Sequence, residues 1–82
     1  MIYIITPNLL DFKRVCQLRG IEIKFNFNGF PINKDVRWIR NWKTLQETTH
    51  MPTEVIYGFE FYKFQDKEQE QIKNEITMRQ KS

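Results

Sequence analysis

The chain has 82 residues, with 13 Lys and Arg against 10 Asp and Glu, and aromatic residues make up 15% of it. This content of apolar and aromatic side chains excludes a disordered chain, and the single cysteine excludes an internal disulfide framework. No apolar run approaches the roughly 20 residues that a membrane-spanning helix needs. We therefore predict a single small domain over residues 1–82.

The first two predicted elements are a buried strand and an amphipathic helix. Residues 2–5 are all β-branched or aromatic, which predicts a strand over 2–6 with neighbours on both of its edges. Asn8 is a favourable helix cap and Gly20 a favourable helix stop, so we predict a helix over 9–19.

A hairpin is predicted next. Apolar and polar residues alternate strictly over 21–27, which predicts a half-exposed strand. Asn28-Gly29 follows it, and this pair is typical of two-residue hairpin turns. The return strand over 30–32 is short because Pro31 cannot donate a hydrogen bond to the ladder.

The segment 35–47 fits two interpretations. As a helix it places Trp38, Trp42 and Leu45 at the i, i+4 and i+7 positions of one face. As a strand over 36–40 it combines tryptophan and isoleucine in a short window, and a turn would follow. We favour the strand and leave the helix open.

The last two elements are a long strand over 54–64 and a polar helix over 66–79. One face of the strand fills the core, and the other exposes Tyr62 and Phe64 unless the last helix covers them. Exposed aromatic side chains on a strand are typical of an interface, so these two residues are a candidate contact surface. A homodimer through this surface and a monomer are equal alternatives.

This order of elements favours an α/β fold. We predict a small sheet of three to five strands, at least partly parallel, with two helices. The inserted hairpin turns near Asn28-Gly29.

The charge is uneven along the chain, and its basic part contains the candidate binding site. Residues 1–45 carry eight basic and three acidic side chains, a net +5, whereas residues 46–82 carry five basic and seven acidic side chains, a net −2. The candidate partner-binding residues are Arg37, Trp38, Arg40, Trp42 and Lys43. Interleaved basic and aromatic side chains suit nucleic acid and equally suit a protein hot spot. The simplest alternative places Trp38 in the core and the basic groups in solvent.

We expect no enzymatic activity and no cofactor. His50 and Cys16 are the only residues of their kind and lie too far apart in sequence for a structural zinc site, so no metal site is predicted. The sole serine, Ser82, is the last residue, so no serine nucleophile is predicted. The turn at 6–8 offers helix amides to an anion, but Asp11 would repel one.

Four segments carry a resemblance to a known group of proteins. They are residues 2–6, 18–20, 36–45 and 54–58. With them the chain resembles small uncharacterised bacteriophage α/β proteins of minimal Rossmann-like fold. The resemblance implies three parallel strands in the order 2-1-3, with 21–33 as an inserted hairpin, and it brings no catalytic or cofactor residue.

The function that we expect is that of a non-enzymatic binding protein. It would be phage-encoded, cytoplasmic in the host cell, and an inhibitor or modulator of a host or defence protein, without membrane contact. The alternative is a small nucleic-acid-binding accessory protein that uses the basic and tryptophan patch.

Overall fold

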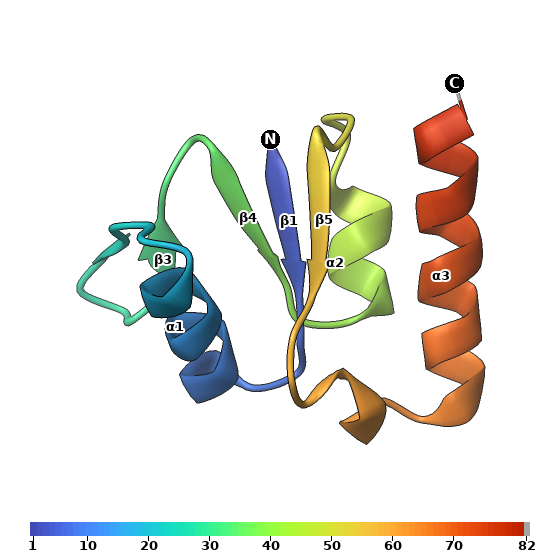
Figure 1. The fold of residues 1–82 in the computed structure, drawn as a ribbon, viewed down its shortest axis with the longest axis horizontal. Helices are drawn as coiled ribbons and strands as arrows, with labels where there is room; N and C mark the ends of the chain where they lie inside the picture. The colour runs from blue at the N-terminus through green and yellow to red at the C-terminus, as the bar shows by residue number, and fades with distance from the viewer. Residues whose placement is uncertain (82) are drawn as a thin grey trace.

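The computed structural model describes residues 1–81, which form a three-stranded parallel sheet between helices, with a small hairpin at one side (Figure 1). The strands are β1 (Ile2–Ile5), β2 (Lys24–Phe25), β3 (Pro31–Ile32), β4 (Val36–Ile39) and β5 (Glu54–Tyr57). The helices are α1 (Leu9–Leu18), α2 (Trp42–Glu47), α3 (Asp66–Lys81) and a 3₁₀ turn, η1 (Phe61–Lys63). The sheet order β4-β1-β5 confirms the predicted α/β fold and the 2-1-3 order of its core.

The core has two layers, one on each face of the sheet. Side chains of β1 alternate between the layers, with Ile4 in one and Tyr3 and Ile5 in the other. Helix α1 covers the first face, where Phe12 packs, and helices α2 and α3 cover the second (Figure 1). A central strand buried on both faces needs an apolar side chain at every position, which explains the composition of residues 2–5.

The predicted hairpin is present, but its turn differs from the prediction. The turn is not a two-residue Asn28-Gly29 turn, because only Gly29 has a positive φ, +83°. Asn26 instead closes a three-residue loop: its backbone N–H donates to the Phe30 carbonyl at 2.9 Å, and its side chain accepts from Asn28 N and Phe30 N. A left-handed glycine at the end of such a loop makes a bulge.

The strands of the hairpin are also shorter than the predicted 21–27 and 30–32. Only Lys24–Phe25 and Pro31–Ile32 pair with each other. Ile21 and Ile23 pack against the core under α1 instead of continuing the ladder. Their alternation therefore reflects packing against a helix and not strand pairing.

Segment 35–47 is a strand followed by a short helix, and Trp38 does not share a helix face with Trp42 and Leu45. A strand forms over Val36–Ile39, as favoured, but helix α2 then replaces the predicted turn, so the described chain has three α-helices and not two. Asn41 is the cap of α2: its side-chain Oδ1 accepts from Thr44 N at 2.7 Å and from the Thr44 hydroxyl at 2.9 Å. Leu45 anchors the helix in the core.

The predicted long strand 54–64 is wrong beyond Tyr57. At Gly58 the backbone meets Asp11 and Thr6 so closely that an added Cβ would lie 2.7 Å from the Thr6 Cβ. The chain turns there and enters η1, whose Phe61 packs in the core layer between the sheet and α3. The remaining predicted ends (2–6, 9–19, 36–40 and 66–79) differ from the structure by one or two residues, as helix and strand ends commonly do.

Helix α3 holds both ends of the short helix α2. At the beginning of α2, the Trp42 backbone N–H donates to Glu68 Oε2 at 2.8 Å. At its end, the Arg79 guanidinium donates to the carbonyls of Leu45 at 3.0 Å and Thr48 at 2.7 Å. A carboxylate therefore lies at the positive end of the helix dipole and a guanidinium at the negative end.

None of the described helices is long and apolar enough to cross a membrane.

Candidate functional site

Strand β4 lies at an edge of the sheet, and within residues 1–81 it pairs only with β1. The carbonyls of Asp35 and Ile39 face β1, where they accept from Ile2 N at 2.7 Å and Thr6 N at 3.1 Å. Backbone groups alternate in direction along a strand. The N–H and C=O groups of Val36 and Trp38 therefore point away from the sheet, and no hydrogen bond among the described residues engages them.

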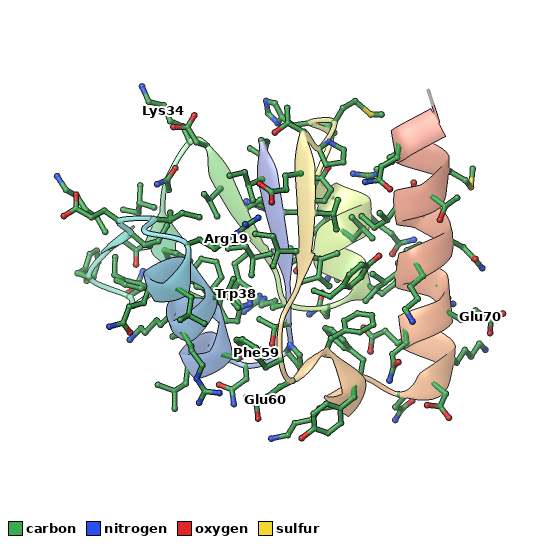
Figure 2. The ribbon with its side chains drawn as sticks, in the orientation of Figure 1. Arg19, Lys34, Trp38, Phe59, Glu60 and Glu70 are labelled. Atoms are coloured by element: carbon green, nitrogen blue, oxygen red, sulfur yellow. The ribbon has the colours of Figure 1, made fainter. Side chains whose placement is uncertain are left out.

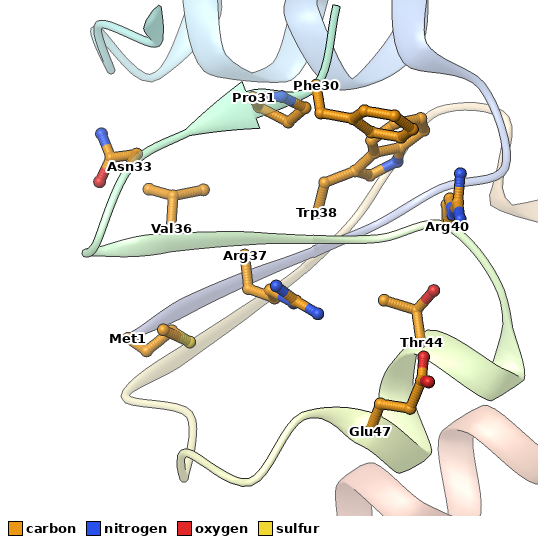
Figure 3. Close-up of a pocket in the computed structure, with 10 residues that line it drawn as sticks. All are labelled: Met1, Phe30, Pro31, Asn33, Val36, Arg37, Trp38, Arg40, Thr44 and Glu47. Atoms are coloured by element: carbon orange, nitrogen blue, oxygen red, sulfur yellow. The ribbon is translucent and has the colours of Figure 1, made fainter. Parts of the chain in front are cut away.

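A pocket of about 360 Å³ lies along this free edge (Figure 3). Phe30 and Pro31 of the hairpin form one wall, and Thr44 and Glu47 of α2 form the other. The floor between them is β4 itself. The position of the pocket follows from the connections, because the hairpin leads directly into β4 and α2 leads directly out of it.

Two arginines enter this pocket from opposite faces of the sheet: Arg37 belongs to β4 and Arg40 directly follows it. Arg37 lies on the side of α2, and its Nε donates to the Thr48 hydroxyl at 3.3 Å. Arg40 lies on the side of the hairpin, with its guanidinium carbon 5.4 Å from the centre of the Phe30 ring. No acidic side chain among residues 1–80 forms an ion pair with either arginine, although Glu47 lines the same pocket. The pocket therefore offers two guanidinium groups to an anionic partner.

Trp38 is the third predicted residue in the pocket, and much of its ring is already in use. The ring lies between α1 and the sheet, 5.6 Å from Phe12 (Figure 2). Its indole N–H donates to the Thr6 carbonyl at 2.9 Å. Trp38 is half-buried, so one edge of its ring lines the pocket while the rest packs in the core.

The other predicted contact residues do not join this group. Trp42 is half-buried against the core under α3, and Lys43 is exposed on α2 outside the pocket. Tyr62 is 67% exposed, but Phe64 is only 6% exposed and belongs to the core cluster of α3, so the expected exception, cover by the last helix, applies to Phe64, and it is not available as a contact residue. Phe64 packs edge-on against Phe61, because the chain there is a 3₁₀ turn folded under α3 and not a strand.

Sequence reasoning missed the walls of the pocket. Phe30, Asn33, Thr44 and Glu47 line it beside the arginines. The sequence did contain a signal for Phe30 and Asn33, because a hairpin inserted directly before an edge strand must end beside that strand. No comparable signal marked the residues of α2, because that segment was interpreted as a turn.

Two titratable groups outside the pocket, Cys16 and Asp11, are buried in the fold. Cys16 lies on the buried face of α1, and burial raises the pKa of its thiol, which disfavours the reactive thiolate. Asp11 is fully buried and accepts from the Thr6 hydroxyl at 2.7 Å and from Glu60 N at 2.9 Å. Its carboxylate thus ties the turn at 6–8 to the turn between β5 and η1. Among the described residues, no three His, Cys, Asp or Glu side chains gather as metal ligands would.

No protein-family model, curated protein or solved structure matches the chain.

Proposed function

We propose that this protein is a non-enzymatic binding protein that docks a partner protein along the free edge of β4. The observation that carries the proposal is the pocket on this edge, where neither the outward backbone groups of β4 nor the two arginines have a hydrogen-bond or acidic partner, respectively, among the described residues. Free sheet edges are normally shortened, covered or protected by charges, because they recruit other strands. Here the edge forms the floor of a walled groove, which suits the addition of a partner strand.

The half-buried tryptophans favour a protein partner over a nucleic acid. Single-stranded nucleic acids bind by stacking bases on free aromatic faces beside basic groups. The Trp38 ring packs near Phe12, and Trp42 packs against the core. Neither indole offers the open face on which the nucleic-acid alternative depends, whereas peptide binding to a strand edge needs only the rim of Trp38.

The resemblance to small bacteriophage proteins extends the proposal to the nature of the partner. The partner would be a host or defence protein that this chain inhibits or modulates.

The test compares two double variants in capture from a bacterial lysate. The variant Arg37→Glu with Arg40→Glu reverses both charges of the pocket, and we expect it to bind the captured partner at least about tenfold more weakly. The control variant, Arg14→Glu with Lys67→Glu, makes the same change of net charge at exposed positions of α1 and α3 and should bind like the wild type. Equal loss in both variants, or no stoichiometric partner, would contradict the proposal.

A further inference from the structure

Resting on the proposed function, we infer that the β4 groove selects an extended acidic peptide with two carboxylates at positions i and i+3 and an apolar residue at i+2. The surfaces that carry this inference are the two arginines, the rim of Trp38 and the outward backbone groups of β4.

The spacing of the carboxylates follows from the positions of the arginines. Residues directly opposite each other in paired strands project to the same face of the sheet. Arg37 projects toward α2 and Arg40 toward the hairpin, as their contacts with Thr48 and Phe30 show. The two partner residues opposite them are therefore three positions apart and project to opposite faces. A pair of carboxylates at i and i+2 would place both on one face and leave one arginine without a partner.

The apolar position follows from Trp38. The Trp38 ring lies on the hairpin side of β4, where Phe30 and Pro31 form an apolar wall. A partner residue opposite Trp38 projects to that same side and meets this wall. In an antiparallel strand it comes two positions after the residue opposite Arg40 and one position before the residue opposite Arg37. The predicted order is then acid, any residue, apolar, acid.

The backbone determines the direction of the added strand. In an antiparallel pair, a hydrogen-bonded residue exchanges both its N–H and its C=O with the residue directly opposite. Trp38 has both groups free on the outer edge, so an antiparallel strand bonds through its apolar residue at i+2. In a parallel strand these bonds would go to the two residues that flank the opposite residue. Because antiparallel pairing is the more stable per residue, we infer the antiparallel arrangement.

Glu47 adjusts the affinity of the groove. Its carboxylate lines the pocket on the α2 side, where Arg37 also lies, and it forms no ion pair among the residues that the structure describes. It would repel the acid at i+3. Glu47→Gln is therefore expected to tighten binding of the acidic peptide by severalfold.

The experiment measures binding of fluorescent ten-residue peptides by fluorescence polarisation. The reference peptide has glutamate at i and i+3, isoleucine at i+2 and threonine elsewhere. Changing either glutamate to glutamine should weaken binding about tenfold, and moving the second glutamate to i+2, with isoleucine at i+3, should weaken it similarly. Methylation of the backbone nitrogen at i+2 should abolish binding, whereas methylation at i+1, whose N–H points away from β4, should leave it unchanged.

Two protein variants assign each carboxylate to its arginine. In Arg40→Gln, changing the glutamate at i should no longer matter; in Arg37→Gln, changing the glutamate at i+3 should no longer matter. Both arginines are exposed, so glutamine should leave the fold intact. The opposite assignment would show a parallel strand and overturn the inferred direction.

The outcomes separate this inference from the proposed function. If methylation at i+2 abolishes binding but the spacing of the acids has no effect, the selectivity is wrong and docking on the edge stands. If no peptide binds while the captured partner still depends on Arg37 and Arg40, the selectivity is again wrong and the proposed function stands. If oligothymidine binds through both arginines and no peptide binds, the partner is a nucleic acid and both proposals fail.

Discussion

At the scale of single residues, Gly58 determines where the sheet ends. It follows β5 directly, and the fully buried side chains of Asp11 and Thr6 lie against its backbone. The carboxylate of Asp11 ties three segments together there, because it accepts from the Thr6 hydroxyl and from Glu60 N. A side chain at position 58 would separate them.

The change Gly58→Ala is therefore expected to lower the free energy of unfolding by about 2 to 4 kcal/mol, as overpacking against buried atoms does. Its Cβ would lie 2.7 Å from the Thr6 Cβ and closer still to Asp11 Oδ2. The measurement is urea unfolding followed by tryptophan fluorescence. Gly29→Asn is the control: no atom lies within 4 Å of the added Cβ, and asparagine tolerates the positive φ of that turn. A loss below about 0.5 kcal/mol for Gly58→Ala would show that the contact yields easily.

At the scale of elements, helix α2 depends on α3 for both of its ends. It spans only Trp42–Glu47, and so short a helix is not stable on its own. The Arg79 guanidinium donates to the carbonyls at the end of α2, and it also donates to the Tyr3 hydroxyl at 2.8 Å. The apolar contact of α3 rests mainly on Ile72 and Ile76, so these polar bonds contribute much of its docking.

Arg79→Met keeps the length of the side chain and removes its donors. We expect the free energy of unfolding to fall by about 2 to 3 kcal/mol, because buried carbonyls lose charged donors. Amide hydrogen exchange in α2 should rise more than exchange in β1. Lys67→Met, at an exposed position of the same helix, should change neither quantity measurably. Unchanged exchange in α2 would mean that the core contact of Leu45 alone holds this helix.

The elements also show how far a sequence can be interpreted. The run of apolar residues at 2–5 predicted a central strand correctly, because full burial on both faces leaves no other composition. The alternation along 54–64 predicted one long strand, but the strand in the structure ends at Tyr57. Phe61 and Phe64, which alternation would place on opposite faces, both enter the core because they lie three positions apart at a 3₁₀ turn. The alternation therefore predicted neither the end of the strand nor the burial of Phe64, because the contact of Gly58 with Asp11, 47 positions earlier, changes the path of the chain.

The candidate site was predictable to the same degree. Arg37, Trp38 and Arg40 gather in the pocket because they lie within four consecutive residues, in the edge strand β4 or directly after it. Trp42 belongs to the same basic and aromatic segment, but it is the first residue of α2, and there it packs against the core. Composition indicated the basic and aromatic character of the site. It did not indicate which rings are free, because that depends on tertiary packing.

At the scale of the whole molecule, the basic half of the chain builds the groove. Residues 1–45, with a net charge of +5, form β1, α1, the hairpin, β4 and the first turn of α2. Lys34 points away from the fold at the start of β4, on the opposite side from Glu70 of α3 (Figure 2). This distribution would draw an acidic partner toward β4 and would do so less at high salt.

The hairpin contributes little to the stability of the fold, but it forms one wall of the groove. Its tip exposes apolar side chains, with Phe27 99% exposed, and its cation–ring contacts are those of Lys13 with Phe25 and Arg40 with Phe30. Exposed contacts of this kind contribute about 0.5 to 1 kcal/mol each. Lys24 pairs with Ile32, so residues 23 and 33 lie close enough for a short link.

Replacing residues 24–32 by Gly-Asn-Gly should therefore keep the free energy of unfolding within about 2 kcal/mol of the wild type, because a shorter loop offsets part of the lost contact energy. The same variant loses the wall made by Phe30 and Pro31. Its affinity for the acidic peptide should fall about tenfold, while its dependence on the glutamate that faces Arg37 persists. Urea unfolding and fluorescence polarisation measure the two effects separately. A cooperative fold that binds the peptide as tightly as the wild type would place the binding surface elsewhere on the molecule.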